Sequence, residues 1–580
     1  MTQFVNPYTF IPLRRRTRVA TIASSDKAEY YSGVITCKLT VKTPLIIPAN
    51  KIKTDDLANP AHPITPFFRV DGQPLIPASS LRGPIRSMYE ALTDSCLRTN
   101  DTRLQSAGGR KTPGIVEWDE EANGFVLHEA NRYRIKDITL CETLSTGDEV
   151  FIRYTPEEGN NIIETAGIVD DISLNHEPGT IPGVFLQVNT FINDKGTPNR
   201  PSVFVKTGDV PTPLDDDCIR CLEKNVSDYQ ANNENGEQPE FSQQYKSCLD
   251  RLKRHEGLLP VWQGYERKAD RTWAIELAHA QLSRSVFPQS PVTFAKALEL
   301  GECGKHGETP CPACALFGFV GGKTTKSQAG HVRFTDATPV GEIGFEQVAL
   351  PALLGPRPSA FEFYLRNDNA KSRRSYTPET PGTQLSGRKV YWHSPSGISR
   401  VDMEHLTGFE SRAEAASVGS SFRFDVYFDR IDKTQLNQLV YTLSLGGVWD
   451  EATGKHYHKM GHGKPVGAGS VHVKVENVLV RSALGSHYAV DEWETLGLKF
   501  ETLASVELTL RNISEIKWVT DFNALPANVT IDYPRTDSSS NIFDWFGDNR
   551  KRTYNDDSPT LPIYKQILPR IDDRRQTLDA

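Results

Sequence analysis

The sequence predicts an α+β protein with a mainly β module in its middle. Apolar and polar residues alternate over 34–41 and again over 421–428, which indicates strands that each bury one face. Amphipathic helices are predicted to follow residue 78 and to cover 433–445. Between residues 100 and 300, short strand-like pieces are separated by Gly, Pro and Asn, which favours a β-rich module.

Length and composition restrict the class of protein. The 580 residues are 38% hydrophobic and 24% charged, a globular composition long enough for several domains. There is no apolar run of the length that spans a membrane, and the N-terminus lacks a signal pattern, so we expect a cytoplasmic protein without a membrane partner. The net charge of -7 argues against non-specific DNA binding, although it leaves room for a local basic groove.

The first strand is followed by a polar loop, a hairpin and a helix. Asp71 and Gly72 mark the turn of the hairpin over 67–76. Ser79 or Ser80 is expected to cap the helix. The apolar face of the helix is made by Leu81, Ile85, Met88, Tyr89 and Leu92.

Two arginines share another face of this helix. Arg82 and Arg86 are four residues apart, and with the serines at the helix N-terminus they would suit a phosphate backbone. The alternative is that both arginines are ordinary surface charges.

Four potential zinc ligands lie within twelve residues. Cys303 and His306 are three residues apart, as are Cys311 and Cys314, and a short loop joins the two pairs. This spacing predicts a tetrahedral zinc site, and the alternative is a loop that merely holds three thiols. Because protein groups fill all four positions, the zinc would be structural.

A second cysteine pair is Cys218 and Cys221. It leaves a second metal possible, but no matching pair follows, so we favour two cysteines in the first turns of a helix.

A glycine-rich loop precedes a strand near the end of the folded part. It contains Gly461, Gly463, Lys464, Gly467 and Gly469. Free backbone N–H groups in such a loop could cradle phosphate, although the residue after Lys464 is proline, so the loop lacks the spacing of an ATP-binding loop. The alternative is a tight turn that needs glycine for steric reasons alone.

The ordered set of motifs resembles the RAMP superfamily of CRISPR-associated proteins. The set is the alternating first strand, Ile-Pro-Ala-Ser-Ser-Leu-Arg-Gly over 76–83, Cys-Pro-Ala-Cys-Ala-Leu-Phe-Gly over 311–318, and the loop over 461–470. More narrowly, it is similar to the backbone subunits of type III CRISPR effector complexes. The resemblance covers about 30–95 and 301–480.

The resemblance implies an RRM-like (ferredoxin-like) core that a large insertion splits. The predicted organisation is 1–99 and 301–535 for the core with its zinc knuckle, 100–300 for the insertion, and 536–580 for a polar tail. Such subunits bind a guide CRISPR RNA and complementary target RNA beside other effector subunits. The resemblance therefore implies that Arg82, Arg86, Ser79, Ser80 and the glycine loop contact guide phosphates.

The resemblance also implies a site for target cleavage. In cutting members, an aspartate after the first strand promotes attack of a target 2′-OH on the adjacent phosphate, and a carboxylate can do so by taking or orienting the proton. Asp55 and Asp56 are the candidates here, with His62 as an alternative because it stands nearer the usual position. Magnesium is a further candidate cofactor for the cleavage.

Two other functions remain open. The chain could be a non-cutting RNA-binding scaffold whose insertion contacts a partner subunit. It could also be an endonuclease that processes guide precursors, for which His456, His458 and His462 would supply acid–base groups near the glycine loop.

Overall fold

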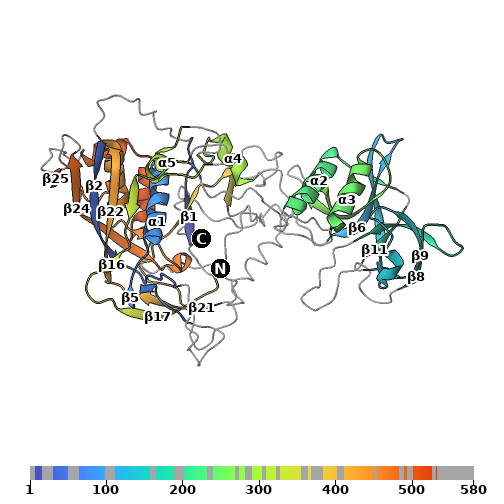
Figure 1. The fold of residues 1–580 in the computed structure, drawn as a ribbon, viewed down its shortest axis with the longest axis horizontal. Helices are drawn as coiled ribbons and strands as arrows, with labels where there is room; N and C mark the ends of the chain where they lie inside the picture. The colour runs from blue at the N-terminus through green and yellow to red at the C-terminus, as the bar shows by residue number, and fades with distance from the viewer. Residues whose placement is uncertain are drawn as a thin grey trace, which may run out of the picture. The chain divides into compact units, whose positions relative to one another are not determined.

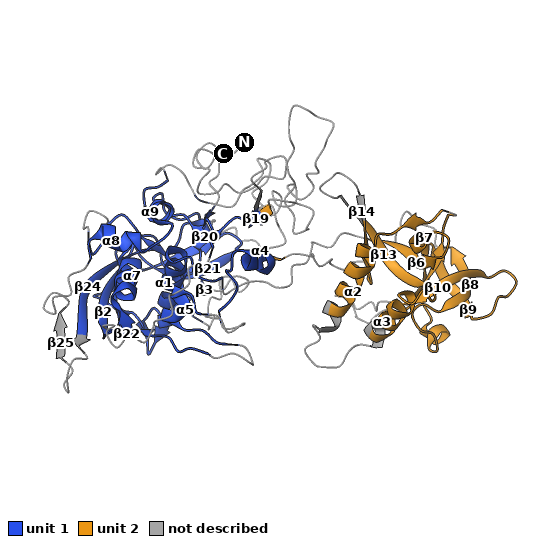
Figure 2. Ribbon diagram, turned by 90° about the horizontal axis from the view of Figure 1, so that it is seen from above, with its two compact units in different colours: residues 1–100, 291–366, 384–580 blue, residues 101–290, 367–383 orange. Residues whose placement is uncertain are grey.

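The computed structural model divides the chain into two compact units, shown in blue and orange in Figure 2. Unit 1 comprises 1–100, 291–366 and 384–580, and unit 2 comprises 101–290 and 367–383. The structure describes residues 7–15, 30–49, 64–97, 111–156, 165–187, 201–208, 210–231, 240–267, 273–280, 290–303, 309–321, 327–353, 364–367, 383–400, 410–449, 454–482, 489–492, 501–525 and 531.

Unit 1 is built around an antiparallel sheet whose strands come from distant parts of the chain (Figure 1). In the residues described, this central sheet has seven strands. They are β2 (Tyr30–Val41), β15 (Val332–Phe334), β16 (Thr338–Pro339), β22 (Ser421–Asp432), β23 (His458–Lys459), β24 (Ser470–Ser482) and β25 (Ala489–Glu492).

The long strand β2 lies between β22 and β24 and is antiparallel to both. β15 and β16 pair with the far side of β22, and β23 and β25 pair with β24. Alternate residues of β2 are buried, namely Ile35, Cys37, Leu39 and Val41. The alternation predicted for this strand is therefore present, because successive side chains of a strand point to opposite faces.

Helices α1 (Ala78–Leu92) and α7 (Lys433–Ser444) cover one face of the central sheet. α7 packs on β2, β22 and β24, and α1 packs on α7. α7 begins with a capping box, in which Asp432 accepts from the backbone of Gln435 and the Gln435 side chain accepts from the backbone of Asp432. The apolar sides of sheet and helices form one hydrophobic core.

The start of α1 differs from the expectation. Ser79 and Ser80 lie inside the first turn and neither caps the helix, because the N-cap residue is Pro77. The carboxylate of Asp336 instead accepts a hydrogen bond of 2.7 Å from the backbone N–H of Ala78. An acidic group therefore already occupies the electropositive helix terminus, which disfavours phosphate there.

The predicted hairpin is present before α1. β4 (Arg69–Val70) pairs with β5 (Gln73–Pro74), and the turn residues Asp71 and Gly72 have φ of 50° and 79°. Two positive φ angles are the requirement of the tight hairpin turn that Asp-Gly favours.

Smaller elements complete unit 1. β1 pairs with β20, and β21 lies between β17 and β3. The elements are β1 (Tyr8–Ile11), β3 (Ile64–Thr65), β17 (Phe345–Leu350), β20 (Arg388–Tyr391), β21 (Ser411–Ala416), α4 (Pro291–Ala297), α5 (Pro312–Phe317), α8 (Leu503–Leu508), α9 (Ile513–Thr520) and the 3-10 turn η3 (Lys464–Val466). Short strands β18 (Leu365–Asn367) and β19 (Thr383–Leu385) occur where the chain passes between units.

Unit 2 is a mostly antiparallel sheet with two helices. α2 packs against β14 and α3 packs against β13, and their apolar sides share a core with the sheet. The elements are β6 (Thr112–Asp119), β7 (Gly124–Ile135), η1 (Ile138–Cys141), β8 (Glu149–Pro156), β9 (Gly167–Ser173), β10 (Ile181–Leu186), β11 (Ser202–Lys206), β12 (Thr212–Pro213), α2 (Asp216–Ala231), α3 (Glu240–Leu252), β13 (Leu259–Arg267) and β14 (Trp273–Ala278).

The predicted module of 100–300 and the unit of 101–290 cover nearly the same residues, and the structure adds 367–383 to that unit. The predicted tail of 536–580 lies outside the described residues. Among the helices described, none has the length and apolarity needed to cross a membrane.

Candidate metal centre and basic loop

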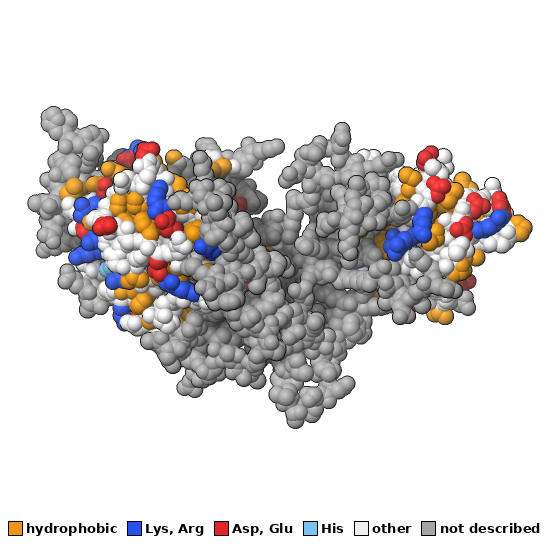
Figure 3. Space-filling model, turned by 90° about the horizontal axis from the view of Figure 1, so that it is seen from below, with side chains coloured by type: hydrophobic (Ala, Val, Ile, Leu, Met, Phe, Trp, Pro, Cys, Tyr) orange, Lys and Arg blue, Asp and Glu red, His pale blue; other side chains and the backbone are white. Residues whose placement is uncertain are grey.

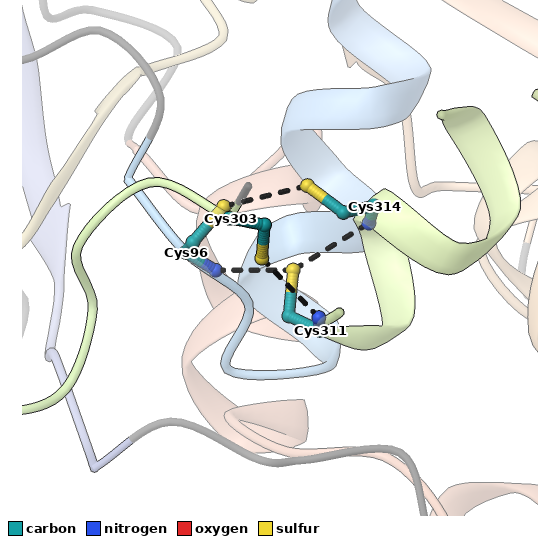
Figure 4. A group of neighbouring side chains, drawn as sticks. All are labelled: Cys96, Cys303, Cys311 and Cys314. Atoms are coloured by element: carbon teal, nitrogen blue, oxygen red, sulfur yellow. Dashed lines mark hydrogen bonds between the residues drawn. The ribbon is translucent and has the colours of Figure 1, made fainter. Parts of the chain in front are cut away.

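Four cysteines of unit 1 bring their thiols together in the core. Cys96, Cys303, Cys311 and Cys314 are all buried, and their Sγ atoms all lie within 4.8 Å of one another. Figure 4 shows the thiols facing one another from three places: the loop after α1, the loop before α5, and α5 itself. In the part of the chain that the structure describes, no other group of three or more His, Cys, Asp or Glu residues has this arrangement.

Local hydrogen bonds favour the thiolate of Cys311 in this four-cysteine cluster and raise the pKa of Cys96 and Cys314. The backbone N–H groups of Cys96, Cys311 and Cys314 donate to sulfur at 3.3–3.5 Å, and Cys311 is the N-cap of α5. Hydrogen bonds from the thiols of Cys303, Cys314 and Cys96 lower the pKa of the Cys311 thiol. Four converging, buried thiols are the donor set that zinc takes in structural sites. These residues could therefore hold a zinc ion with no position open to substrate.

The cluster contains a ligand that the local cysteine spacing does not indicate. Cys303, Cys311 and Cys314 were predicted, whereas the fourth thiol comes from Cys96, 215 residues before Cys311. His306 lies outside the described residues. A lone cysteine after a helix gives no local signal, so only the fold reveals its role.

Arg86 is buried beside the cluster rather than exposed to RNA. Its Nε donates to Glu90 Oε1 at 2.8 Å, and its terminal nitrogens donate to Gly318 O at 3.2 Å and to Cys314 Sγ at 3.5 Å. The side chain is 9% exposed. The prediction that Arg86 faces guide phosphates is therefore wrong in this structure, because its guanidinium is committed to the core.

Arg82 is half-buried and also contacts the segment after the cysteines. It donates to Phe317 O at 2.6 Å, and its guanidinium lies 5.7 Å from the centre of the Phe317 ring. Ser79 is exposed and Ser80 is half-buried at the same end of the helix. The helix face that was predicted to contact phosphate thus packs largely against α5.

Arg388 of β20 is a second buried cation near the thiols. It donates to Ser95 O and lies 3.7 Å from Glu90 Oε2. Burial lowers the pKa of Arg388, an effect opposed by the charges of Glu90 and Cys96. Arg86 and Arg388 therefore lie near the thiols, and their positive charges would offset part of the net negative charge of four thiolates around a divalent ion.

The glycine-rich loop is packed tightly against its own unit. Gly461, Gly463, Gly467 and Gly469 all have positive φ, between 73° and 96°. A Cβ at Gly469 would overlap the carbonyl oxygen of Met460. The N–H of Gly469 donates to Pro44 O and that of Gly467 to Lys464 O. The steric interpretation therefore holds at these two glycines, and their N–H groups are not free to cradle phosphate.

Three lysines surround the loop instead. Lys464 donates to Gly461 O at 2.6 Å, and Lys459 donates to Gly467 O at 2.8 Å and Ser470 Oγ at 3.0 Å. Lys389 lies over the ring of Tyr8, 3.9 Å from its centre.

Within this lysine cluster, Lys464 repels the positive charges of Lys389 and Lys459. Burial, with repulsion from Lys464, lowers the pKa of Lys389 to about 8 and that of Lys459 well below its usual value. Burial also lowers the pKa of Lys464. No carboxylate of the described residues forms an ion pair with any of the three lysines. The charged forms of these lysines therefore have no ion-pair partner among the described residues.

The histidines near the loop differ in exposure. His456 and His458 are buried and bonded to Thr520 Oγ1 and Leu443 O, each at 3.0 Å. Burial lowers the pKa of His458 to about 4. His462 is exposed, and burial of its ring, with repulsion from Lys464, lowers its pKa. Only His462 of these three is therefore accessible to a substrate.

The other residues predicted for catalysis or for a second metal do not form a site among the described residues. Asp55, Asp56 and His62 lie outside the described residues. Cys218 donates to Ile275 O at 3.2 Å, and Cys221 is exposed. The described residues therefore give no support for a second metal site there.

Solved structures of CRISPR proteins were among those matched. A type III-B Cmr-beta bound to cognate target RNA matches at 11% identity and a TM-score of 0.18, covering 77% of this chain and 98% of that chain. The apo state of Cmr-beta matches at 10% identity and a TM-score of 0.19, with the same coverage. Csc2 of Thermofilum pendens matches at 10% identity and a TM-score of 0.17, covering 72% and 90%. TM-scores this low establish no shared fold.

A search of curated proteins found no match to the chain. The comparison with protein families did find a match. The model of the RAMP superfamily matches residues 38–198, a stretch that includes part of β2, all of α1 and part of unit 2. The motifs at 311–318 and 461–470 lie outside this match. This match to the RAMP superfamily model confirms the resemblance that the sequence motifs indicated.

Proposed function

We propose that this chain is a subunit of a type III CRISPR effector complex that binds the backbone of a guide RNA and positions complementary target RNA. The observation that carries the proposal is the cluster of Lys389, Lys459 and Lys464 around the glycine loop. Burial, with repulsion from Lys464, lowers the pKa of Lys389 and Lys459, so a bound phosphate would stabilise the charged forms of these lysines.

The order of strands supports an RRM-like core for this subunit. Four strands of the central sheet and the two helices that cover it follow one another along the chain as β2, α1, β15, β22, α7 and β24, with other elements between them, which is the βαββαβ order of ferredoxin-like domains. Across the sheet they run β24, β2, β22, β15, all antiparallel. Both helices lie on the same side of the sheet, so neither of them covers the opposite side.

The guide-binding surface proposed here differs in its residues from the surface that the sequence predicted. Arg86 is removed from it, and the loop glycines serve to fold the backbone so closely that the lysines converge. Lys464 remains from the sequence prediction, and Lys389 and Lys459 are added. The four-cysteine cluster would hold a structural zinc that fixes α5 against the end of α1.

Target cleavage is a further part of the proposal. Asp55 or Asp56, with His62 as the alternative, would assist attack of a target 2′-OH on the adjacent phosphate. Magnesium could serve that reaction. If none of these groups acts, the chain is a non-cutting scaffold subunit whose unit 2 contacts a partner. The burial of His456 and His458 gives no support to a guide-processing endonuclease.

The proposal is tested by identifying the RNA that is bound to the chain. The chain is isolated from its host with its associated subunits, and the bound RNA is sequenced. We expect CRISPR repeat-derived guides, and we expect the double variant Lys389→Gln with Lys464→Gln to lose them. The matched control is Lys455→Gln with Lys517→Gln, two exposed lysines elsewhere in unit 1. Random cellular RNA, or equal loss in both variants, would contradict the proposal.

A further inference from the structure

The open face of the central sheet carries a row of cations from three neighbouring strands. Lys38 of β2 is paired in register with Arg423 of β22 on one side and with Lys474 of β24 on the other. Its chain neighbours Cys37 and Leu39 are buried on the side of α1 and α7. Because side chains alternate along a strand, Lys38 points to the opposite, uncovered face.

This arrangement costs stability unless something compensates for it. Like charges directly opposite each other on neighbouring strands are destabilising. Arg423 is compensated by Glu476, at 2.9 Å. Asp425 lies on the same face and accepts a hydrogen bond from Thr36 at 2.8 Å. Lys38 and Lys474 form no ion pair with a carboxylate of the described residues, so they are cations without a direct partner on a face that also carries the carboxylates of Asp425 and Glu476.

The row continues toward the glycine loop. His472 lies on the same face of β24, and burial, followed by repulsion from Lys42 and Lys474, lowers its pKa. The N–H of Lys42 donates to Ser470 O at 2.9 Å, and Ser470 follows directly after the loop. Lys459 Nζ donates to Ser470 Oγ at 3.0 Å, so Lys42 and Lys459 both contact the residue at which the glycine loop enters β24.

Aromatic side chains accompany this row of cations. Tyr427 of β22 is 49% exposed and is paired in register with Val34 and Arg333. Near the loop, the Tyr457 ring lies 5.5 Å from the His472 ring and 5.7 Å from the amino group of Lys42. Figure 3 shows Lys and Arg side chains at the edge of unit 1 on the side of β2 and β24.

We propose that this open face is a second binding surface, for single-stranded RNA that extends beyond the glycine loop. The surface, called here the sheet track, consists of Lys38, Lys42, Tyr427, His472 and Lys474. Strands lie about 4.8 Å apart, so the row is narrow enough to follow one phosphate backbone. An exposed aromatic ring beside cations, here Tyr427, is the combination that binds unpaired bases with little sequence preference. The sheet track goes beyond the proposed function, because it uses none of the loop lysines.

The experiment measures binding of the purified full chain to a short labelled polyuridine over a range of salt concentrations. The variant is Lys38→Gln with Lys474→Gln. We expect affinity to fall about tenfold at low salt, and the slope of log affinity against log salt to become shallower by about 1.4, since each phosphate contact on a single strand contributes about 0.7. The control is again Lys455→Gln with Lys517→Gln, which removes the same charge.

Three results would bear directly on the sheet track. Equal affinity of the variant and the control would overturn it, because the net field of the protein would then account for binding. The variant should unfold at the same temperature as the wild type or higher, since repulsion is removed. Unchanged polyuridine binding with lost polyglutamate binding would show an acidic-protein surface and would also overturn it.

A second comparison keeps this inference distinct from the proposed function. The double variant Lys389→Gln with Lys464→Gln removes the loop lysines and leaves the sheet track intact. If that variant loses all polyuridine binding while the sheet variant loses none, the sheet track is wrong and the loop proposal stands. If only the sheet variant loses binding, the sheet track stands and the loop proposal is wrong.

Discussion

The Sγ atom of Cys96 lies 3.5 Å from the Sγ atom of Cys314, although 218 residues separate the two cysteines along the chain. One cysteine follows α1 and the other lies within α5. A metal ion held by both cysteines would join two segments of unit 1 that are separated in the sequence by residues 101–290 of unit 2. Binding energy at such a site contributes to folding energy, because the unfolded chain does not preform it.

Cys96→Ser should abolish stoichiometric zinc, whereas His306→Ala should retain it. Cys96 completes a set of four buried thiols, so the loss of one ligand leaves an incomplete tetrahedron. Elemental analysis of the purified protein gives the zinc content, and thermal unfolding with and without a chelator gives the effect on stability. Retention of zinc by Cys96→Ser together with its loss in His306→Ala would contradict the assignment.

Arg86→Gln should destabilise the protein and leave its RNA affinity unchanged. Among the described residues, the substitution leaves buried Glu90 with Arg388, at 3.7 Å, as its ion-pair partner, and breaking a buried ion pair costs about 3–5 kcal/mol. Urea unfolding measures the loss. Arg82→Gln is the comparison, and a smaller loss of about 1 kcal/mol is expected for its hydrogen bond to Phe317 O. A stable Arg86→Gln protein with weakened RNA binding would instead support a phosphate-facing Arg86.

Affinity for RNA at the glycine loop should fall as pH rises through about 8. The folded-state pKa of Lys389 is lowered to about 8 from its usual 10.5, so the free protein loses this charge within that range. The cost of burying the charged lysine is fully present below pH 8 and is relieved toward 10.5, so the stability of the free protein should rise across that window.

Affinity measured from about pH 7 to 9 tests this prediction. Lys389→Arg keeps its charge and should flatten the profile, since arginine stays protonated. The control is Lys455→Gln, which should retain the wild-type profile. A profile that is already flat in the wild type would exclude Lys389 from the RNA surface.

The double variant Asp55→Ala with Asp56→Ala should abolish one cut in a guided target RNA and spare guide binding. Products should end in a 2′,3′-cyclic phosphate and a 5′-OH, because the nucleophile is the adjacent 2′-OH. A carboxylate contributes about 10²–10⁴-fold through proton transfer. Gel analysis of a labelled target measures the cut, and a target with 2′-deoxyribose at that position should resist it. If His62→Ala alone stops cleavage, the histidine is the catalytic group. If neither change matters and the complex still assembles, the chain is a scaffold.

The sequence by itself determined the elements whose signals are local. Alternation over β2 placed Ile35, Cys37 and Leu39 on one buried face, because the period of a strand is two residues. Asp71 and Gly72 marked a turn that requires two positive φ angles. The spacing of Cys311 and Cys314 indicated a metal site, and the ordered motifs indicated the RAMP superfamily.

Tertiary structure decided which side chains contact one another and which are buried. Cys96 joins the cysteine cluster because the chain after α1 passes beside α5, and no short-range spacing encodes that meeting. Arg86 shows the same limit: helical spacing placed it on one face with Arg82, but only the packing of α5 made that face buried. Lys38, Arg423 and Lys474 form a row through strand register alone. Register is fixed by burial of the opposite face across hundreds of residues, so a single strand's sequence cannot reveal it.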